Sequence, residues 1–239
     1  MQYKVLIPTS GTGSRLGELT AAQNKALVPI NGKPALAYII EAYPRSVPLV
    51  VTLGYRAQEV KPWLMEAYPS REIEFVLVDK YEGPGTSLGY SMLQARSQLQ
   101  CPFIFQACDT LLTESIPEPD MNWVGGYTMP PELKTVAAQH YRTQSCNDEG
   151  RLLSINPIGT ADFNYIHIGI TGVHDFEAWW DALSMLYSKN PTDSTLTDTH
   201  VITAMLEQQH TFAVVPYAKW YDTGNPEALA ETRAYFERV

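Results

Sequence analysis

A glycine-rich segment near the N-terminus has the residue types of a phosphate-binding loop. The apolar run 5–7 is typical of a buried first strand, and it is followed directly by Pro8-Thr9-Ser10-Gly11-Thr12-Gly13-Ser14-Arg15-Leu16-Gly17. Glycines carry no side chain, so backbone N–H groups in such a turn can approach an anion closely. Arg15 offers a planar guanidinium group suited to phosphate oxygens, and Lys25 adds a point charge. These residues predict a polyphosphate site.

Two common phosphate loops do not fit this segment. The Walker string Gly-x-x-x-x-Gly-Lys-[Ser/Thr] does not occur in the chain. The dinucleotide fingerprint Gly-x-Gly-x-x-Gly would need glycine at Leu16, and Arg15 inside the turn would crowd a pyrophosphate.

The segment instead resembles the opening of the sugar-phosphate nucleotidylyltransferases. That family begins with Gly-x-Gly-[Thr/Ser]-Arg-[Leu/Met], followed by Pro-Lys-x-Leu-x-Pro-[Ile/Val]-x-Gly-Lys-Pro. This chain has GTGSRL at 11–16, NKALVPI at 24–30 and GKP at 32–34. Asn24 replaces the usual proline beside Lys25.

The resemblance continues in family order to the C-terminus. Gly85-Thr86-Ser87-Leu88 resembles the family's Gly-Thr-Ala-x-Ala, and the apolar run 103–108 ends at Asp109. The run 168–173 resembles the strand beneath the acceptor, and residues 220–227 (WYDTGNPE) match Trp-x-Asp-[Ile/Thr]-Gly-Thr-Pro-Glu. The matched segments extend over nearly the whole chain.

The resemblance implies a role for each matched residue. Arg15 would contact the β- and γ-phosphates of an NTP, Lys25 would contact phosphate near the point of attack, and both are the catalytic candidates. Asp109 and Asp222 would bind Mg²⁺, which prefers carboxylates and phosphate oxygens. The nucleotide-binding candidates are Thr9, Ser10, Gly11, Thr12, Gly13, Ser14, Arg15, Gly85 and Thr86.

The acceptor side departs most from the family. Many sugar-specific members carry Glu-Lys-Pro where this chain has Asn156-Pro157-Ile158, so a phosphate-binding lysine is missing. We expect Lys219 to replace that cation, with Gly169 and His167 also at the acceptor; His167 can equally be a core histidine. The acceptor is a sugar phosphate or another small phosphate, such as a phospho-amino-alcohol.

The base of the nucleotide is chosen by elimination. Uridylyl and thymidylyl members often carry glutamine before the Gly-Thr element, whereas this chain has Tyr81-Glu82-Gly83-Pro84. CTP is therefore favoured. Gln58 and Gln106 remain alternatives for reading a base.

Composition limits the class of protein. A chain of 239 residues with 45% hydrophobic residues is typical of one large globular domain. The net charge of −9 argues against nucleic acid and membrane surfaces as partners. The three cysteines lack metal-site spacing, and no secretory signal is evident, which favours the cytoplasm. The oligomeric state stays open, with a homodimer as one option.

Alternating apolar and helical segments predict an α/β fold. Strands at 3–7, 48–53, 73–78 and 103–107 alternate with helices at 35–43, 57–68 and 87–99, which is typical of a parallel sheet with helices on both faces. The second half is expected to hold strands at 122–129, 135–141, 152–156 and 211–216, a hairpin turn at 147–150, and helices at 175–187, 198–208 and 225–237. With the resemblance, this predicts a three-layer sandwich with a mixed, mostly parallel Rossmann-like sheet, the nucleotide-diphospho-sugar transferase fold. Residues 1–239 would form one domain, with a nucleotide-binding half at about 1–110 and an acceptor-binding half at about 111–239.

The expected function is a Mg²⁺-dependent nucleotidyltransferase that joins an NTP to a small phosphorylated acceptor and releases pyrophosphate. Its product would be an activated precursor for cell-surface polysaccharide. A glycosyltransferase of similar fold is an alternative, although its Asp-x-Asp motif is absent because Thr110 and Leu111 follow Asp109. A non-catalytic nucleotide sensor is the third possibility.

Overall fold

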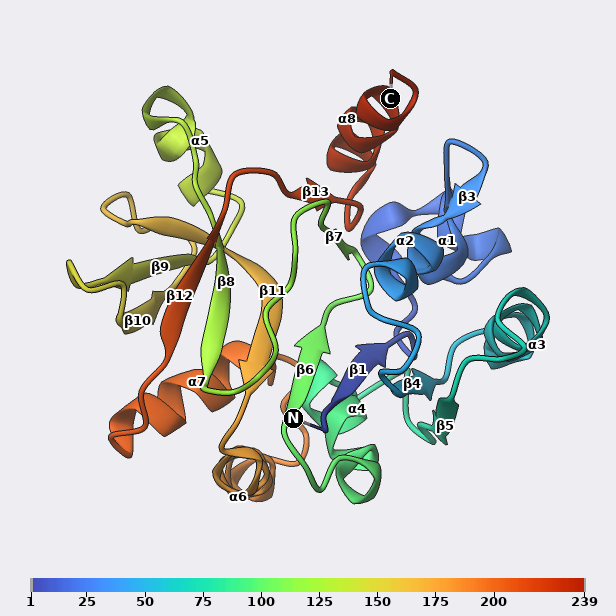
Figure 1. Cartoon of the computed structure of the whole chain (residues 1–239), viewed down its shortest axis with the longest axis horizontal. Helices are drawn as coiled ribbons and strands as arrows, with labels where there is room; N and C mark the ends of the chain where they lie inside the picture. The colour runs from blue at the N-terminus through green and yellow to red at the C-terminus, as the bar shows by residue number, and fades with distance from the viewer. Residues whose placement is uncertain (1, 239) are drawn as a thin grey trace.

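Nine strands form one central sheet in the computed structural model, which describes residues 2–238 (Figure 1). The strand order is β10-β9-β11-β6-β1-β4-β5, and β8 pairs with β11 and with β12. Only β10 and β11 run against the other strands of this sheet, so it is mixed and mostly parallel, as predicted.

The elements follow one another along the chain as alternating strands and helices in the first half and as a strand-rich region in the second. The strands are β1 (Lys4–Pro8), β2 (Pro29–Ile30), β3 (Lys33–Pro34), β4 (Leu49–Leu53), β5 (Ile73–Leu77), β6 (Phe103–Gln106), β7 (Thr110–Leu111), β8 (Trp123–Tyr127), β9 (Thr143–Cys146), β10 (Leu152–Asn156), β11 (Tyr165–Val173), β12 (Ala213–Tyr217) and β13 (Tyr221–Asp222). The α-helices are α1 (Glu18–Ala22), α2 (Ala35–Glu41), α3 (Ala57–Ala67), α4 (Leu88–Gln94), α5 (Lys134–Ala138), α6 (Phe176–Lys189), α7 (Asp198–Glu207) and α8 (Pro226–Phe236). Short 3₁₀ helices lie at Ser14–Leu16, Lys25–Leu27, Arg96–Gln98 and Pro131–Leu133.

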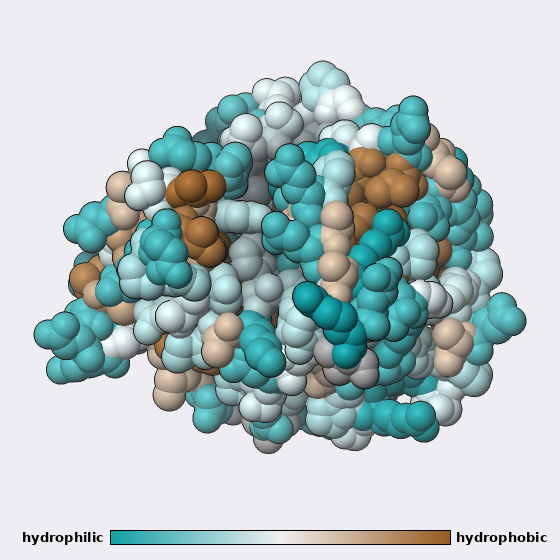
Figure 2. Space-filling model, turned by 90° about the horizontal axis from the view of Figure 1, so that it is seen from above, coloured by the Kyte–Doolittle hydropathy of each residue, from teal (hydrophilic) through white to brown (hydrophobic). Residues whose placement is uncertain are grey.

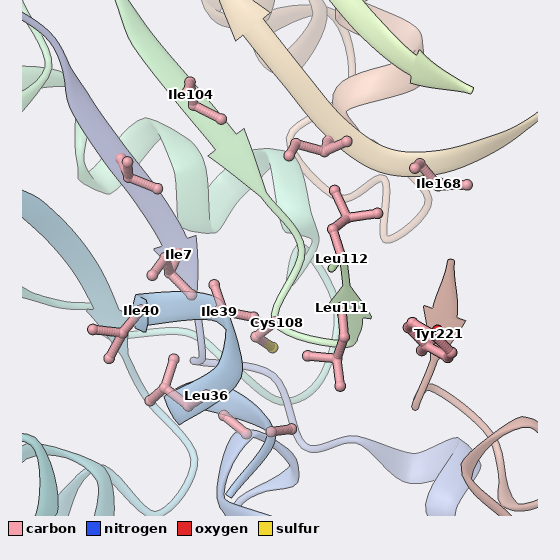
Figure 3. Close-up of a cluster of buried hydrophobic side chains, with 14 of the residues drawn as sticks. Ile7, Leu36, Ile39, Ile40, Ile104, Cys108, Leu111, Leu112, Ile168 and Tyr221 are labelled. Atoms are coloured by element: carbon pink, nitrogen blue, oxygen red, sulfur yellow. The ribbon is translucent and has the colours of Figure 1, made fainter. Parts of the chain in front are cut away.

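Side chains of the central strands alternate between two apolar layers. Val5 and Ile7 of β1 pack into a core with α2 and α3, whereas Leu6 packs into a second core with α4, α6 and α7. Successive strand residues point to opposite faces, and both faces here are covered by helices, so β1 is apolar throughout. Figure 3 shows part of the first core, where Leu36, Ile39 and Ile40 lie near Ile7.

Two antiparallel pairings join the halves of the chain. β11 pairs with β6, with Ile170 opposite Gln106, so strands from both halves belong to the same sheet. The short strand β13 pairs with β7, and this pairing places Asp222 opposite Thr110, the residue after Asp109. The two halves therefore meet at the carboxyl end of β6.

The structure confirms the predicted helices and most of the strands. The hairpin turn at 147–150 joins β9 to β10, where the backbone N–H of Asn147 donates to the carbonyl of Arg151 and its carbonyl accepts from the backbone of Gly150. One predicted strand is wrong, because residues 134–138 form the helix α5 and the strand β9 follows at 143–146. Pro131 begins the preceding 3₁₀ helix, and Ala137 and Ala138 turn to the interior, so burial of a helical face outweighs the β-branched residues Thr135 and Val136.

Among residues 2–238, no helix is both long enough and apolar enough to cross a membrane.

Candidate active site

The glycine-rich loop leaves β1 at its carboxyl end and is fixed by the neighbouring elements. Ser10 accepts a hydrogen bond from the backbone of Tyr55 at 2.8 Å, and the Thr9 hydroxyl donates to the carbonyl of Thr52 at 2.7 Å. The Asn24 amide donates to the carbonyls of Thr9 and Tyr55, at 3.0 Å and 2.7 Å. Asn24 is fully buried, so the residue that departs from the family pattern ties the loop to the segment after β4.

Gly13 is required where the loop turns. Its φ is +68°, a left-handed conformation that favours glycine. A Cβ atom at this position would lie 2.9 Å from Cβ of Lys25. Gly13 therefore lets the loop pass close beside Lys25, which brings the lysine to the same site as Arg15.

The loop forms one side of a pocket of about 540 Å³, called here the loop pocket. It opens where β1 and β6 end, at the edge of the sheet that faces the viewer in Figure 2, and that face is hollowed near its middle. Its lining residues are Pro8, Ser10, Gly11, Thr12, Gly13, Ser14, Arg15, Lys25, Lys80, Tyr81, Thr86, Ser87, Leu88, Ser91, Ala107, Cys108, Asp109, Ser194, Thr197 and Gly224.

Two cations meet Asp109 at the floor of the loop pocket. Lys25 Nζ lies 3.1 Å from Asp109 Oδ2, and Arg15 Nη2 lies 3.7 Å from the same oxygen. The Arg15 side chain is 72% exposed, whereas those of Lys25 and Asp109 are 20% and 16% exposed. Arg15 is thus the cation most open to a ligand.

These charges lower the pKa of Asp109 and raise the pKa values of Lys25 and Asp222. Burial opposes ionisation of Asp109, but Lys25 and Arg15 outweigh it and hold its pKa below the usual range. Burial likewise opposes the charge on Lys25, and Asp109 outweighs it, which raises the lysine's pKa. Asp222 differs, because burial and the nearby charge of Asp109 raise its pKa.

Asp222 converges on Asp109 from the other half of the chain. A Cβ atom on Gly224 would lie 3.0 Å from Asp222 Oδ1 and 3.1 Å from Asp109 Oδ2, so both carboxylates face the same small space. Asp222 also accepts hydrogen bonds from the backbone of Gly224 at 2.7 Å and from the hydroxyl of Tyr141 at 3.1 Å. Burial and Asp222 raise the pKa of Tyr141 to about 12, so the phenol remains a donor.

This pair of carboxylates fits a magnesium ion. Within the described residues no group of three or more His, Cys, Asp or Glu side chains could hold a metal by itself. Mg²⁺ is commonly held by one or two carboxylates plus substrate phosphates, so it does not need a third protein ligand. A cation between Asp109 and Asp222 would also relieve the repulsion that raises the pKa of Asp222.

A second pocket, of about 260 Å³, adjoins the first and is called here the aromatic pocket. Tyr141 and Trp220 stand edge to face in its wall, with ring centroids 5.2 Å apart. The lining residues are Arg15, Leu88, Phe105, Ala107, Asp109, Thr110, His140, Tyr141, Arg142, Ile158, His167, Ile168, Gly169, Thr197, Asp198, Thr199, Trp220 and Asp222. Five of these residues also line the loop pocket, namely Arg15, Leu88, Ala107, Asp109 and Thr197.

His167 is held in a buried chain of hydrogen bonds beside the aromatic pocket. Its Nδ1 lies 2.9 Å from Nε2 of Gln144, and its Nε2 lies 3.0 Å from Oδ2 of Asp198. The Gln144 amide also donates to the carbonyl of Gly125. Both ring nitrogens of His167 are therefore engaged by side chains of the protein. His167 is thus both a core residue and a pocket residue.

Most of the predicted site residues line one of the two pockets. The exceptions are Thr9, which is fully buried behind the loop, Gly85 and Lys219. Gly85 has a φ of +84°, and a Cβ there would lie 2.9 Å from the carbonyl oxygen of Pro191. Lys219 is exposed, and its Nζ lies 5.8 Å from the centre of the Tyr235 ring. The structure therefore does not bring Lys219 to either pocket.

Sequence reasoning missed several lining residues. Lys80 adds a third cation to the loop pocket, and Tyr141 and Arg142 line the aromatic pocket. Tyr141 and Arg142 fall between α5 and β9, the region where the predicted strand was wrong, so no pattern indicated where their side chains point. Gln106, a candidate for reading a base, is fully buried and bonded to Tyr43 and Thr110.

Comparison with known proteins finds a family match in the first half of the chain. Residues 5–117 match the MobA-like NTP transferase domain family. The bifunctional protein GlmU of Methanococcus vannielii is 21% identical over 239 residues, covering 97% of this chain and 54% of that protein. A GlmU of Methanococcus maripaludis is 28% identical over 114 residues, which is 26% of its length. This chain thus spans about half the length of such relatives or less.

Solved structures share the fold over the full chain. The CTP:phosphocholine cytidylyltransferase from Streptococcus pneumoniae superposes with a TM-score of 0.77 at 18% identity, covering 99% of this chain and all of that one. A UDP-glucose pyrophosphorylase complexed with UDP-glucose gives 0.77 at 18% identity, covering 100% of both chains. At these identities the likeness establishes the nucleotide-diphospho-sugar transferase fold. The family match thus covers residues 5–117, just under half of the chain, and together with the relatives and the shared fold it supports a place in the sugar-phosphate nucleotidylyltransferase family.

Proposed function

We propose that the chain transfers a nucleotidyl group from an NTP to a small phosphorylated acceptor and releases pyrophosphate. The observation that carries this proposal is the wall shared by the two pockets. Arg15 and Asp109 line both of them, so an NTP in the loop pocket and an acceptor in the aromatic pocket would have their phosphates at one place. Holding two reactants in line is the main demand of this reaction.

The residues at the shared wall suit nucleotidyl transfer. An oxygen of the acceptor phosphate attacks the α-phosphorus of the NTP, and the bond to the leaving pyrophosphate breaks. The attacking phosphate is already ionised at neutral pH, so no general base is needed. Arg15 and Lys25 would neutralise the charge that develops on the phosphates. Asp109 and Asp222 would hold Mg²⁺, which supplies further positive charge when it is bound.

CTP is the nucleotide that we propose. The described lining of the loop pocket contains no Gln, Asn or Glu side chain, so base reading falls to hydroxyl and backbone groups near Ser87 and Ser91. One structural neighbour is named as a CTP enzyme and another as a UDP-glucose enzyme, so fold likeness alone does not select the base. The proposal of CTP rests on the residues before Gly85-Thr86, where this chain lacks the glutamine that is common in uridylyl and thymidylyl members.

The two other candidate functions leave features of the site unused. A glycosyltransferase of this fold would start from a finished nucleotide sugar and would not need Arg15 beside a triphosphate. A nucleotide sensor would not need two convergent carboxylates or a second pocket that shares the wall of the first.

The decisive experiment measures pyrophosphate. The protein would be incubated with each NTP, Mg²⁺ and one of three acceptors: phosphocholine, glucose 1-phosphate or inositol 1-phosphate. We expect pyrophosphate to appear with one NTP and one acceptor and to require both. Nucleotide binding without pyrophosphate under every condition would support the sensor. Release of nucleoside diphosphate from a nucleotide sugar would support the glycosyltransferase.

A further inference from the structure

Arg142 places an uncommitted positive charge in the aromatic pocket. The residue is half-buried and lines the pocket beside Tyr141, whose hydroxyl binds Asp222. Throughout residues 2–238, no hydrogen bond or ion pair engages its guanidinium group, and its backbone carbonyl accepts from His167 at 2.9 Å. Partial burial takes a guanidinium group out of water, which costs free energy. Binding of an anion there would offset that cost.

The charges around this pocket show why an anion would need Arg142. The acceptor phosphate must enter a space lined by Asp109, Asp198 and Asp222. Among the described lining residues the other arginine is Arg15, which already lies 3.7 Å from Asp109 and also faces the loop pocket. Because Arg15 is the exposed cation at the triphosphate loop, Arg142 supplies a further positive charge that can offset the carboxylates around the acceptor phosphate.

Several other polar side chains of the pocket are already bonded within the protein, whereas Trp220 Nε1 has no hydrogen-bond partner among the described residues. Both ring nitrogens of His167 are bonded, to Gln144 and to Asp198. The Thr110 hydroxyl donates to the carbonyl of Ile168, and the Thr199 hydroxyl bonds to Thr197. These groups have little capacity left for a ligand, whereas all the guanidinium donors of Arg142 are free.

The strand pairing fixes Arg142 at the rim of the pocket. Thr143 of β9 pairs with Asn156 of β10, so Arg142 and Pro157 are the next residues beyond this pair on the two strands. Ile158, one step further, lines the same pocket and is 57% exposed, but it brings no charge. Arg142, which directly precedes β9, is therefore the charged residue at this rim of the pocket.

We infer that Arg142 binds the phosphate group of the acceptor and that the acceptor is a phosphomonoester with few hydroxyl groups, its body packed against Tyr141, Trp220 and Ile158. This inference rests on the proposed function and deepens it. It assigns to Arg142 the role that sequence reasoning gave to Lys219, whose ammonium group lies over Tyr235 instead.

The test compares acceptor and nucleotide kinetics in four variants. Arg142→Ala should lower kcat/KM for the most active acceptor of the panel by about 10- to 100-fold, because a charged phosphate contact is lost. Arg142→Lys should lie between Ala and wild type, since lysine keeps the charge without the bidentate fork. The KM for the NTP should change less than about twofold. Arg45→Ala, which removes an exposed arginine that lines neither pocket, is the matched control, and Lys219→Ala should behave like it.

Two outcomes would overturn the inference: unchanged acceptor kinetics in Arg142→Ala, or a loss in Lys219→Ala as large as that expected for Arg142→Ala. A calorimetric titration separates this failure from failure of the proposed function. Phosphocholine and glucose 1-phosphate would be titrated into protein loaded with Mg²⁺ and a CTP analogue that has a methylene bridge between the α- and β-phosphorus atoms. If the wild type releases no pyrophosphate at all, the proposed function falls. Binding lost in Arg142→Ala would still support the inference, and binding that is equal or absent in both would contradict it.

Discussion

Asp109 and Asp222 perform the same proposed task in different surroundings. Asp109 is paired with Lys25 and lies near Arg15, so its negative charge is stabilised by the protein. Asp222 accepts hydrogen bonds from Tyr141 and Gly224 but also faces the charge of Asp109. Only the first carboxylate therefore contributes to stability through an ion pair.

Asparagine substitutions should separate these contributions. Asp109→Asn and Asp222→Asn should each lower the rate of pyrophosphate release by about 100-fold or more, because each removes a carboxylate from the proposed metal site. Asp109→Asn should also lower the free energy of unfolding by roughly 1–3 kcal/mol, since Lys25 loses its partner. Asp222→Asn should change it by less than about 1 kcal/mol, because the loss of charge relieves repulsion.

Pyrophosphate assays at saturating Mg²⁺ and urea unfolding of the same preparations would check both quantities. Full activity of either variant, or full activity of the wild type in EDTA, would rule out the two-aspartate metal site. Equal stability losses in the two variants would contradict the distinction drawn between their surroundings.

Arg15 should not tolerate replacement by lysine. Its side chain is mostly exposed and touches both pockets, so the fold does not depend on it. Arg15→Lys keeps the charge but loses the planar fork that can bind two phosphate oxygens. We expect kcat to fall by about tenfold or more together with kcat/KM, with the melting temperature unchanged. A normal kcat with only a higher KM for the NTP would mean that Arg15 assists binding alone.

The position of a residue in a pocket lining was predictable where a motif fixes the backbone near the side chain. Asp109 follows β6 and Arg15 lies in the loop after β1, and both strands end at the loop pocket. Lys219 and Arg142 show the limit of this reasoning. Whether a lysine beside a tryptophan faces a pocket or a tyrosine ring depends on the path of the chain and on its rotamer, and the sequence pattern specifies neither.

Among the structural elements, the loop after β1 depends on Gly13 for its path beside Lys25. Gly13→Ala would place a Cβ atom 2.9 Å from Lys25 Cβ and 3.0 Å from Thr20 Cγ2, at a φ of +68°. We expect the free energy of unfolding to fall by roughly 1–3 kcal/mol and the KM for the NTP to rise, because Lys25 must move.

Gly32→Ala is the matched control for this substitution. Gly32 has a φ of +76° in the turn between β2 and β3, and nothing lies within 4 Å of its Cβ position. Gly32→Ala should lower the free energy of unfolding through backbone strain, as Gly13→Ala does, but it should leave the KM for the NTP unchanged. The same rise in KM for both variants, measured alongside urea unfolding, would show that crowding of Lys25 is not the cause.

The elements themselves were predictable where two faces are buried. β1, β4 and β6 read as apolar runs because helices cover both sides of the sheet, and helices α2 and α3 follow the expected boundaries closely. The secondary structure of residues 131–146 was predicted wrongly because α5 is only five residues long. A helix this short gains its stability from tertiary contacts, such as the hydrogen bond from Gly159 N to Ala138 O, and these leave no periodic signal.

For the whole molecule, a chain with a net charge of −9 has to gather its positive charge locally to bind two anionic substrates. Arg15, Lys25 and Lys80 line the loop pocket, and Arg142 lines the aromatic pocket. These residues come from both halves of the chain. The site is therefore complete only when the two halves are joined in the one sheet.

This shared sheet leads us to predict that residues 1–239 unfold as one domain. The predicted halves meet through the pairing of β11 with β6, and each apolar core contains strand residues from both halves. Calorimetry should show one transition with equal calorimetric and van't Hoff enthalpies. Leu49→Ala in the first half and Ile202→Ala in the second both remove fully buried side chains. Each should lower stability by about 2–5 kcal/mol, and hence the one melting temperature by about 4–20 °C. Two transitions, each moved by only one of these substitutions, would instead show that the halves are separate folding units that share a site.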